Sequence, residues 1–263
     1  MACRITRTSA WTARLTTELS SWSKSAFVTL TYDDEHLPKD RSLHKEDVQK
    51  FLKRVRKNYD GDIKYYCCGE YGTSDDGQHR PHYHLIMFGM GTDLYSRTII
   101  QRAWPFCNPE KFLIPSFKGV GTVTPYSIRY VSGYVQKKLT GEQGKHVYLD
   151  NGLLPPFSLC SQKLGLKWAE THKDLLVAED GYNMVNGKVP IPRYIREKLD
   201  IPSRYFDVAK EESEYLLDHG FDKDSLFGLY KRGLVHYAYN EEKDRIIDRK
   251  NKESFLAVKE QIK

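Results

Sequence analysis

The segment His82-Tyr-His-Leu-Ile-Met-Phe88 joins two histidines to an apolar run. Such a run, bounded by turn residues, predicts a strand whose second half enters a hydrophobic core. Residues Ile63–Tyr71 also predict a strand, and the polar residues 72–78 that separate the two predict a connecting loop. The sequence therefore predicts an antiparallel hairpin with the histidines near its open end.

Further elements surround this hairpin. Residues 26–32, Ala-Phe-Val-Thr-Leu-Thr-Tyr, predict a strand, and residues 119–124 predict a short one. Helical spacing of apolar residues predicts a helix that Ser42 caps and that ends near residue 60. A second helix is predicted over 94–104, and residues 105–118 are predicted to be a loop. A third, over 126–139, follows Thr124-Pro125, a capping residue and a proline suited to a first helical turn. We expect an α+β fold with a central antiparallel sheet flanked by helices.

The expected organisation has three parts. These are a basic N-terminal segment over 1–23, a catalytic domain over 24–145 and a C-terminal accessory region over 146–263. The last part is expected to be mainly helical, with charged helices over 207–219 and 240–262.

Composition excludes several classes of protein. Hydrophobic residues make up 40% of the 263, enough for a packed core, and no apolar run approaches the roughly 18 residues of a membrane span. The N-terminus lacks the apolar segment of a secretory signal. The five cysteines form no CxxC pair, which disfavours a zinc ribbon and a disulfide scaffold and fits a reducing cytoplasm.

Positive charge is concentrated in the first part of the chain. Residues 1–145 hold 22 basic and 15 acidic side chains, whereas the remainder holds 19 and 20. Clustered positive charge favours nucleic acid through the release of counterions, although a solvated basic surface is an equally good interpretation of charge alone. The expected DNA contacts are Lys50, Lys53, Arg54, Lys57, Arg129 and Lys138.

The two histidines of the hairpin are candidate metal ligands. Side chains of a strand alternate between faces, so His82 and His84 point the same way. The hairpin would bring Glu70 beside His82, and a carboxylate with two imidazoles suits Mg²⁺ or Mn²⁺. Asp75, Asp76 and His79 are alternative third ligands. A half-exposed strand with incidental histidines is the competing interpretation.

The predicted helix over 126–139 carries candidate nucleophiles. Tyr130 and Tyr134 are four residues apart and therefore share a helix face, with Lys137 one turn beyond. An aromatic stripe packed in the core is the alternative, but Val131 and Val135 already form an apolar stripe on another side. A tyrosine could attack a DNA phosphodiester, leaving a 5′-phosphotyrosine and a free 3′-hydroxyl, with the cation polarising the phosphate and Lys137 assisting.

Taken together, these motifs resemble the HUH-type rolling-circle replication initiators, most closely those of small single-stranded DNA bacteriophages of the microvirus (gokushovirus) kind. The resemblance rests on Phe27–Tyr32 as the first strand motif, on His82-Tyr-His84 as the metal motif, and on Tyr130-x-x-x-Tyr134-x-x-Lys137 as the two-tyrosine motif.

The resemblance implies an HUH endonuclease that nicks and rejoins single-stranded DNA at an origin, which a hairpin could present, in the cytoplasm of a bacterial host. One tyrosine would hold the 5′ end while a host polymerase extends the 3′ end, and the other would cleave the regenerated origin. No GxxxxGK[ST] loop is present, so a host helicase is expected to separate the strands.

A hypothesis of another class is a non-enzymatic protein that binds single-stranded nucleic acid through basic and aromatic side chains. It leaves the two histidines and Glu70 without a role, and chelation separates the two hypotheses, because only cleavage should need the metal.

Overall fold

The computed structural model describes residues 2–73, 79–137, 141–185, 187–201, 212–222 and 238–250. The chain divides into two compact units, Met1–Leu199 and Asp200–Lys263. The expected boundaries at residues 23 and 145 stay a prediction. Within the second unit, residues 212–218 and 238–250 are helical, and the rest of the two helices predicted there lies outside the described residues.

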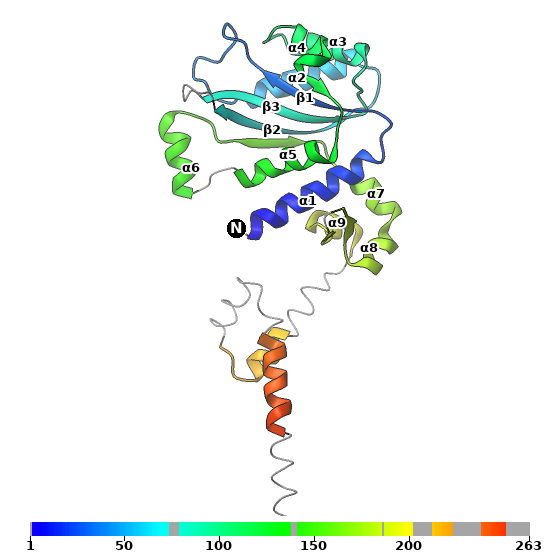
Figure 1. The fold of residues 1–263 in the computed structure, drawn as a ribbon, viewed down its shortest axis with the longest axis vertical. Helices are drawn as coiled ribbons and strands as arrows, with labels where there is room; N and C mark the ends of the chain where they lie inside the picture. Colours follow the sequence, from blue (N-terminus) through cyan, green and yellow to red (C-terminus); the bar gives the residue numbers. More distant parts are fainter. Residues whose placement is uncertain are drawn as a thin grey trace, which may run out of the picture. The chain divides into compact units, whose positions relative to one another are not determined.

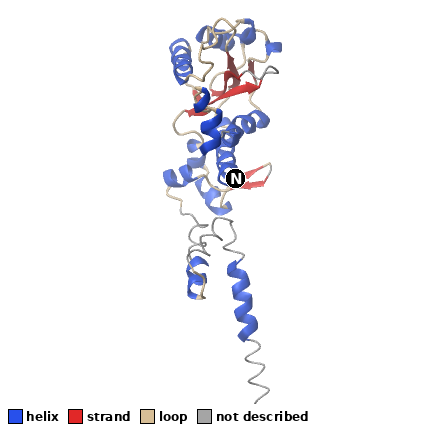
Figure 2. Ribbon diagram, turned by 90° about the vertical axis from the view of Figure 1, so that its left-hand side faces the viewer, coloured by secondary structure: helices blue, strands red, loops and turns tan. Residues whose placement is uncertain are grey.

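A five-stranded antiparallel sheet is the centre of the first unit, as expected for an α+β fold (Figures 1 and 2). The strand order is β4-β1-β3-β2-β5, and β6 and β7 pair separately as a small hairpin. The strands are β1 (Ser25–Thr31), β2 (Lys64–Thr73), β3 (His79–Phe88), β4 (Val120–Gly121), β5 (Phe157–Cys160), β6 (Tyr182–Met184) and β7 (Gly187–Val189).

Helices lie on both sides of this sheet (Figure 1). The α-helices are α1 (Ala2–Leu19), α2 (Lys45–Asn58), α3 (Leu94–Ala103), α4 (Glu110–Leu113), α5 (Pro125–Lys137), α6 (Gly141–Val147), α7 (Leu166–Thr171), α8 (Lys173–Glu179) and α9 (Arg193–Leu199). Two 3₁₀ turns, η1 (Pro115–Phe117) and η2 (Leu149–Asn151), complete the set. Among the described residues, no helix is both long and apolar enough to cross a membrane.

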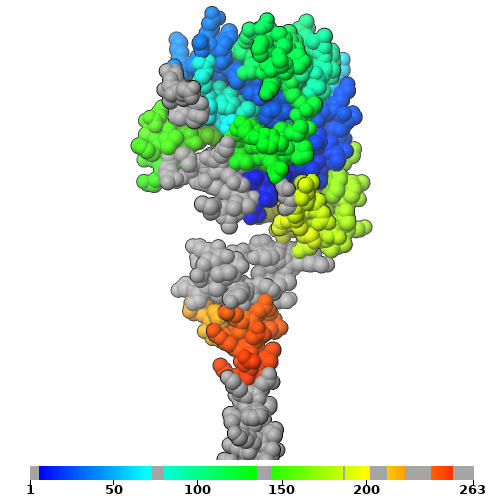
Figure 3. All heavy atoms as spheres, viewed as in Figure 1, coloured from blue at the N-terminus to red at the C-terminus, as the bar shows by residue number. Residues whose placement is uncertain are grey.

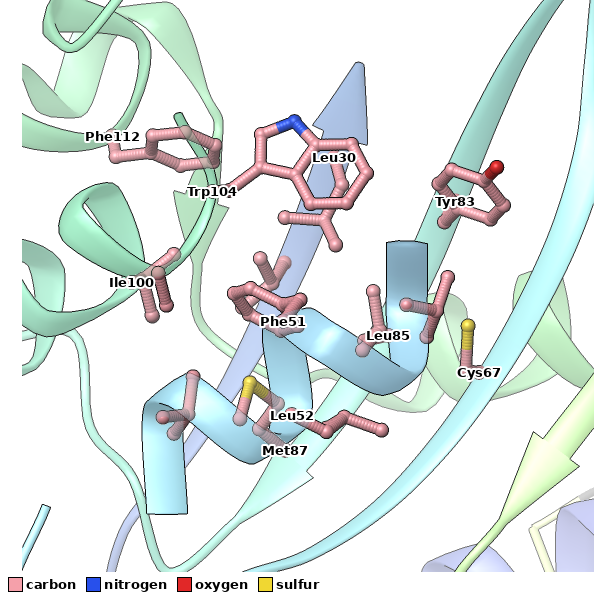
Figure 4. Packing of buried hydrophobic residues seen from close by; sticks show 14 of the residues in the cluster. Leu30, Phe51, Leu52, Cys67, Tyr83, Leu85, Met87, Ile100, Trp104 and Phe112 are labelled. Atoms are coloured by element: carbon pink, nitrogen blue, oxygen red, sulfur yellow. The ribbon is translucent and has the colours of Figure 1, made fainter. Parts of the chain in front are cut away.

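One face of the sheet packs against α2 and α3. Alternate residues of β1 and β3 point to this face, where they meet the apolar side of α2 and the tryptophan that follows α3 (Figure 4). The buried residues that Figure 4 labels are Leu30, Phe51, Leu52, Cys67, Tyr83, Leu85, Met87, Ile100, Trp104 and Phe112.

The opposite face packs against α5 and α1. Ile86 and Phe88 of β3 belong to a second buried cluster with Ile128 and Val131 of α5 and Leu15 of α1. Earlier on the same strand, this face carries His82 and His84, so the alternation that builds the core also brings the histidines to the α5 side.

Helix α5 begins as the sequence predicts. Thr124 Oγ1 accepts a hydrogen bond from the Ser127 backbone N–H at 3.1 Å, and Ser127 Oγ accepts one from the Thr124 N–H at 2.8 Å. This reciprocal cap fixes the first turn of the helix that carries Tyr130 and Tyr134.

The predicted cap at Ser42 is wrong. Helix α2 begins at Lys45, its N-cap residue is His44, and no side chain caps it. The hydroxyl of Tyr83 accepts from the His44 N–H at 2.8 Å, whereas Ser42 Oγ accepts from the Leu154 N–H at 2.8 Å. Tertiary partners thus satisfy the backbone before the helix, and the Ser42 hydroxyl is used elsewhere.

The sequence analysis expected no element in two regions that are helical. The basic N-terminal segment forms α1, and the loop over 105–118 contains α4 and η1. Helix α1 is fixed by the buried carboxylate of Glu18, which accepts from Trp22 Nε1 and the Gly165 N–H, both at 2.7 Å, and pairs with Lys64 at 2.8 Å.

Candidate metal centre and tyrosine pair

Three potential metal ligands converge on the α5 side of the sheet. The β2–β3 register places Glu70 directly opposite His82, and His84 lies two residues along on the same face. Glu70 Oε1 is 2.8 Å from His82 Nε2 and 3.0 Å from His84 Nε2. All three ligand atoms lie within 4.8 Å of one another, close enough to coordinate one ion. The predicted trio is therefore brought together.

Hydrogen bonds behind the histidines orient their rings. His82 Nδ1 lies 3.2 Å from the Arg80 carbonyl oxygen, and His84 Nδ1 lies 3.1 Å from Thr29 Oγ1. A carbonyl can only accept, so His82 Nδ1 carries the proton. The Nε2 of a neutral His82 would then direct a lone pair at the Glu70 carboxylate, which is favourable only with a cation between them. A divalent metal ion meets this requirement.

Protonation states also suit metal binding. Burial opposes ionisation of Glu70, but hydrogen bonds from the two histidines outweigh it and lower the pKa of this carboxyl to about 2. Burial lowers the pKa of His84, whose ring is only 7% exposed. At neutral pH the site therefore offers an anionic carboxylate and a neutral His84 imidazole, the forms that bind metal ions.

Both predicted tyrosines reach this cluster from α5. Tyr130 Oη lies 3.5 Å from Glu70 Oε1, at the limit of a hydrogen bond, and its ring meets the His84 ring edge-on at 5.2 Å. The Tyr134 ring stacks on His84 at 5.9 Å and 14°. Tyr126, one turn before Tyr130, is 74% exposed.

The two phenols differ in accessibility and in protonation. Tyr130 is half-buried, whereas Tyr134 is only 7% exposed. Burial raises the pKa of both groups. The hydrogen bond between them lowers the pKa of Tyr130 and raises that of Tyr134, because Tyr134 acts as the donor. Tyr130 is thus the better placed of the two to lose a proton.

The predicted basic residues do not gather at this site. Helix α2 covers the other face of the sheet, where Lys50, Lys53 and Lys57 are exposed and Arg54 Nε donates to the Ala103 carbonyl at 2.7 Å. Arg129 is exposed on α5.

The other candidates fall outside the described atoms. Lys137 ends α5, but its side chain and that of His79 are not among them, and Asp75, Asp76 and Lys138 lie outside the described residues. DNA contacts by any of these residues stay a prediction.

Thr29 is the site residue that the sequence analysis missed. Strand β1 pairs with β3 so that Thr29 lies opposite His84 and Thr31 opposite His82. The alternation of β1 was visible in the sequence, but its pairing with β3, across more than fifty residues, was not.

Comparisons with known proteins agree with this site. The family model for the replication-associated protein ORF2 matches residues 25–139. The replication-associated protein ORF2 of Spiroplasma virus 4 is 30% identical over 234 residues, which cover 81% of this chain and 71% of that relative. The replication-associated protein VP4 of Bdellovibrio phage phiMH2K is 28% identical over 295 residues, which cover 99% and 87%. No solved structure matches. The chain therefore belongs to this family of phage replication-associated proteins.

Proposed function

We propose that this protein is a replication initiator endonuclease that nicks single-stranded DNA at an origin and rejoins it during rolling-circle replication of a phage genome. The observation that carries the proposal is the 3.5 Å distance between Tyr130 Oη and the Glu70 oxygen that also contacts both histidines. A nucleophile and a metal-ligand set in direct contact suit attack on a phosphodiester.

The chemistry follows from these positions. A divalent cation, Mg²⁺ or Mn²⁺, held by Glu70, His82 and His84 would polarise the scissile phosphate and offset its developing charge. Tyr130 loses its phenolic proton and its oxygen bonds to phosphorus, while the bond to the 3′ oxygen breaks and that oxygen takes up a proton. The products are a 5′-phosphotyrosine and a free 3′-hydroxyl.

The second tyrosine completes the cycle. Tyr134 would cleave the regenerated origin in the same way, and the released 3′-hydroxyl would displace Tyr130 from its phosphate to close a circle. The ester energy is kept in the phosphotyrosine, so no nucleotide cofactor is consumed. Lys137, at the end of the same helix, would hold a phosphate oxygen.

Several parts of the proposal extend beyond the site. The origin would be an unpaired strand, which a hairpin could present, and the basic residues of α2 together with Arg129 and Lys138 would contact its backbone. A host helicase and polymerase would act with the protein in the bacterial cytoplasm. Residues 24–145 would form the endonuclease domain and 146–263 the accessory region.

The test is incubation with circular single-stranded phage DNA and Mn²⁺, followed by mapping of the nick. A covalent protein–DNA adduct is expected with the wild type and with Tyr126→Phe, a matched tyrosine on the same helix. It should be lost in the Tyr130→Phe/Tyr134→Phe double variant and in EDTA. Binding without any cleavage in Mn²⁺ would instead favour the non-enzymatic DNA-binding hypothesis.

A further inference from the structure

A lysine outside the predicted motifs lies beside the candidate metal centre. Lys111, in α4, donates a hydrogen bond from its Nζ to Thr31 Oγ1. Thr31 is the β1 residue directly opposite His82, and directly opposed side chains of an antiparallel pair have Cβ atoms about 4.5–5.5 Å apart. The Lys111 ammonium therefore lies about one residue from the metal ligands, on the β1 side of the histidines.

The short helix that carries Lys111 is held firmly. Buried Arg97 donates from its two terminal nitrogens to the carbonyls of Phe112 and Val120, each at 2.8 Å, and so ties α4 to β4. The Gly119 N–H donates to the Lys111 carbonyl at 3.2 Å. Phe112, the next residue, is fully buried in the core. The backbone that presents this lysine is thus fixed on both sides.

The charge of Lys111 is poorly compensated. The side chain is half-buried, and none of the described carboxylates pairs with it. Burial accordingly lowers its pKa. An ammonium has three N–H donors, and the contact with Thr31 uses one of them. A half-buried cation with spare donors is costly unless an anion binds to it.

We propose that Lys111 binds a non-bridging oxygen of the substrate phosphodiester and holds it against the metal centre. This inference rests on the proposed function and deepens it by naming a residue that would contact the phosphate. Across the sheet, the histidines lie between Thr31 on β1 and Glu70 on β2, so Lys111 would approach the phosphate from the side opposite Glu70. The segment around α4 and helix α5, both green, reach the surface on the face shown in Figure 3, so one strand of DNA could contact both from this side.

The occupant must be an anion for a simple electrostatic reason. An ammonium this close repels a metal ion and lowers the pKa of His84 further. A phosphate that contacts both the cation and Lys111 turns this repulsion into attraction on each side. Lys111 would therefore favour the bound strand more than the free metal.

The test measures binding to a dT20 oligonucleotide in EDTA, where cleavage is absent, at a series of salt concentrations. Each phosphate contact contributes about 0.7 to the slope of log affinity against log salt for a single strand. Lys111→Met should lower this slope by about 0.7, and Lys111→Arg should restore it. Lys167→Met, which removes an exposed lysine of α7, is the matched control and should leave the slope unchanged.

Two further measurements separate binding from folding and from catalysis. The melting temperature of Lys111→Met should equal or exceed that of the wild type, because an uncompensated half-buried charge is removed. Adduct formation in Mn²⁺ should slow by about 10- to 100-fold, as expected for one charged hydrogen bond. An unchanged salt slope, or a Lys111→Met protein that melts earlier, overturns the inference. Absence of an adduct in the wild type refutes the proposed function, and the slope still decides the role of Lys111.

Discussion

Replacing the two tyrosines one at a time should reveal an order of action. Tyr134 is 7% exposed and stacks on His84, whereas Tyr130 is half-buried beside Glu70. Exposing a buried aromatic ring costs about 1.5–3 kcal/mol. Since 1.4 kcal/mol is a factor of ten, first-strand cleavage through Tyr134 should be about 10- to 100-fold slower than through Tyr130.

The assay uses an oligonucleotide that spans the mapped nick and carries a 3′ fluorophore, so that the label stays with the 5′-phosphotyrosine product. Tyr130→Phe should slow the first adduct by the factor above. Tyr134→Phe removes one hydrogen bond to Tyr130, worth about 1 kcal/mol, and should slow it by about fivefold at most. Only Tyr134→Phe should form the first adduct at nearly full rate yet fail to release a closed circle. The reverse pattern, with Tyr134→Phe abolishing the first adduct, would refute the reasoning.

Three further predictions concern metal binding, pH and the fold. Mn²⁺ at 100 times its measured Kd should stabilise the wild type by about 2.7 kcal/mol in thermal unfolding; this gain should disappear in Glu70→Gln and persist in Asp34→Asn, a control at an exposed carboxylate. In metal-free protein the pKa of Glu70 is about 2 rather than 4.5, so its charge contributes about 3 kcal/mol above pH 4.5, and this contribution is lost as the pH falls towards 2. Urea unfolding from pH 5 to pH 2 should therefore show a smaller loss of unfolding free energy in Glu70→Gln than in the wild type, and equal losses would contradict this pKa. Glu18→Ala should destabilise the protein by about 3–5 kcal/mol, because it leaves Lys64 and two N–H donors without their buried partner; a change below about 1 kcal/mol in urea unfolding would show that α1 does not depend on this carboxylate.

Local patterns in the sequence were enough to predict the metal ligands. A hairpin with a short polar loop fixes which residues face each other, and the parity of the strands then places Glu70 with His82 and His84 on one face. The cap at Thr124 was equally local, because it needs only a hydroxyl and a proline in the right order.

Tertiary partners decide the features that the sequence did not reveal. Helix α1 has a mixed, threonine-rich sequence, and its stability comes from packing on α5 and from partners of Glu18 as distant as Gly165. Strand β5 joins the sheet beside β2 from nearly ninety residues away. Lys111 falls in a segment without periodicity, so only its contact with Thr31 relates it to the site.

Mass spectrometry of the trapped adduct tests the central claim most directly. After incubation with the nicked origin strand and Mn²⁺, nuclease and protease digestion should yield a peptide of α5 that carries a 5′-linked nucleotide on Tyr130. The same digest prepared in EDTA, or from a Glu70→Ala variant, should contain only the unmodified peptide. A nucleotide attached to any residue outside α5, or an equal yield of adduct without metal, would contradict the account.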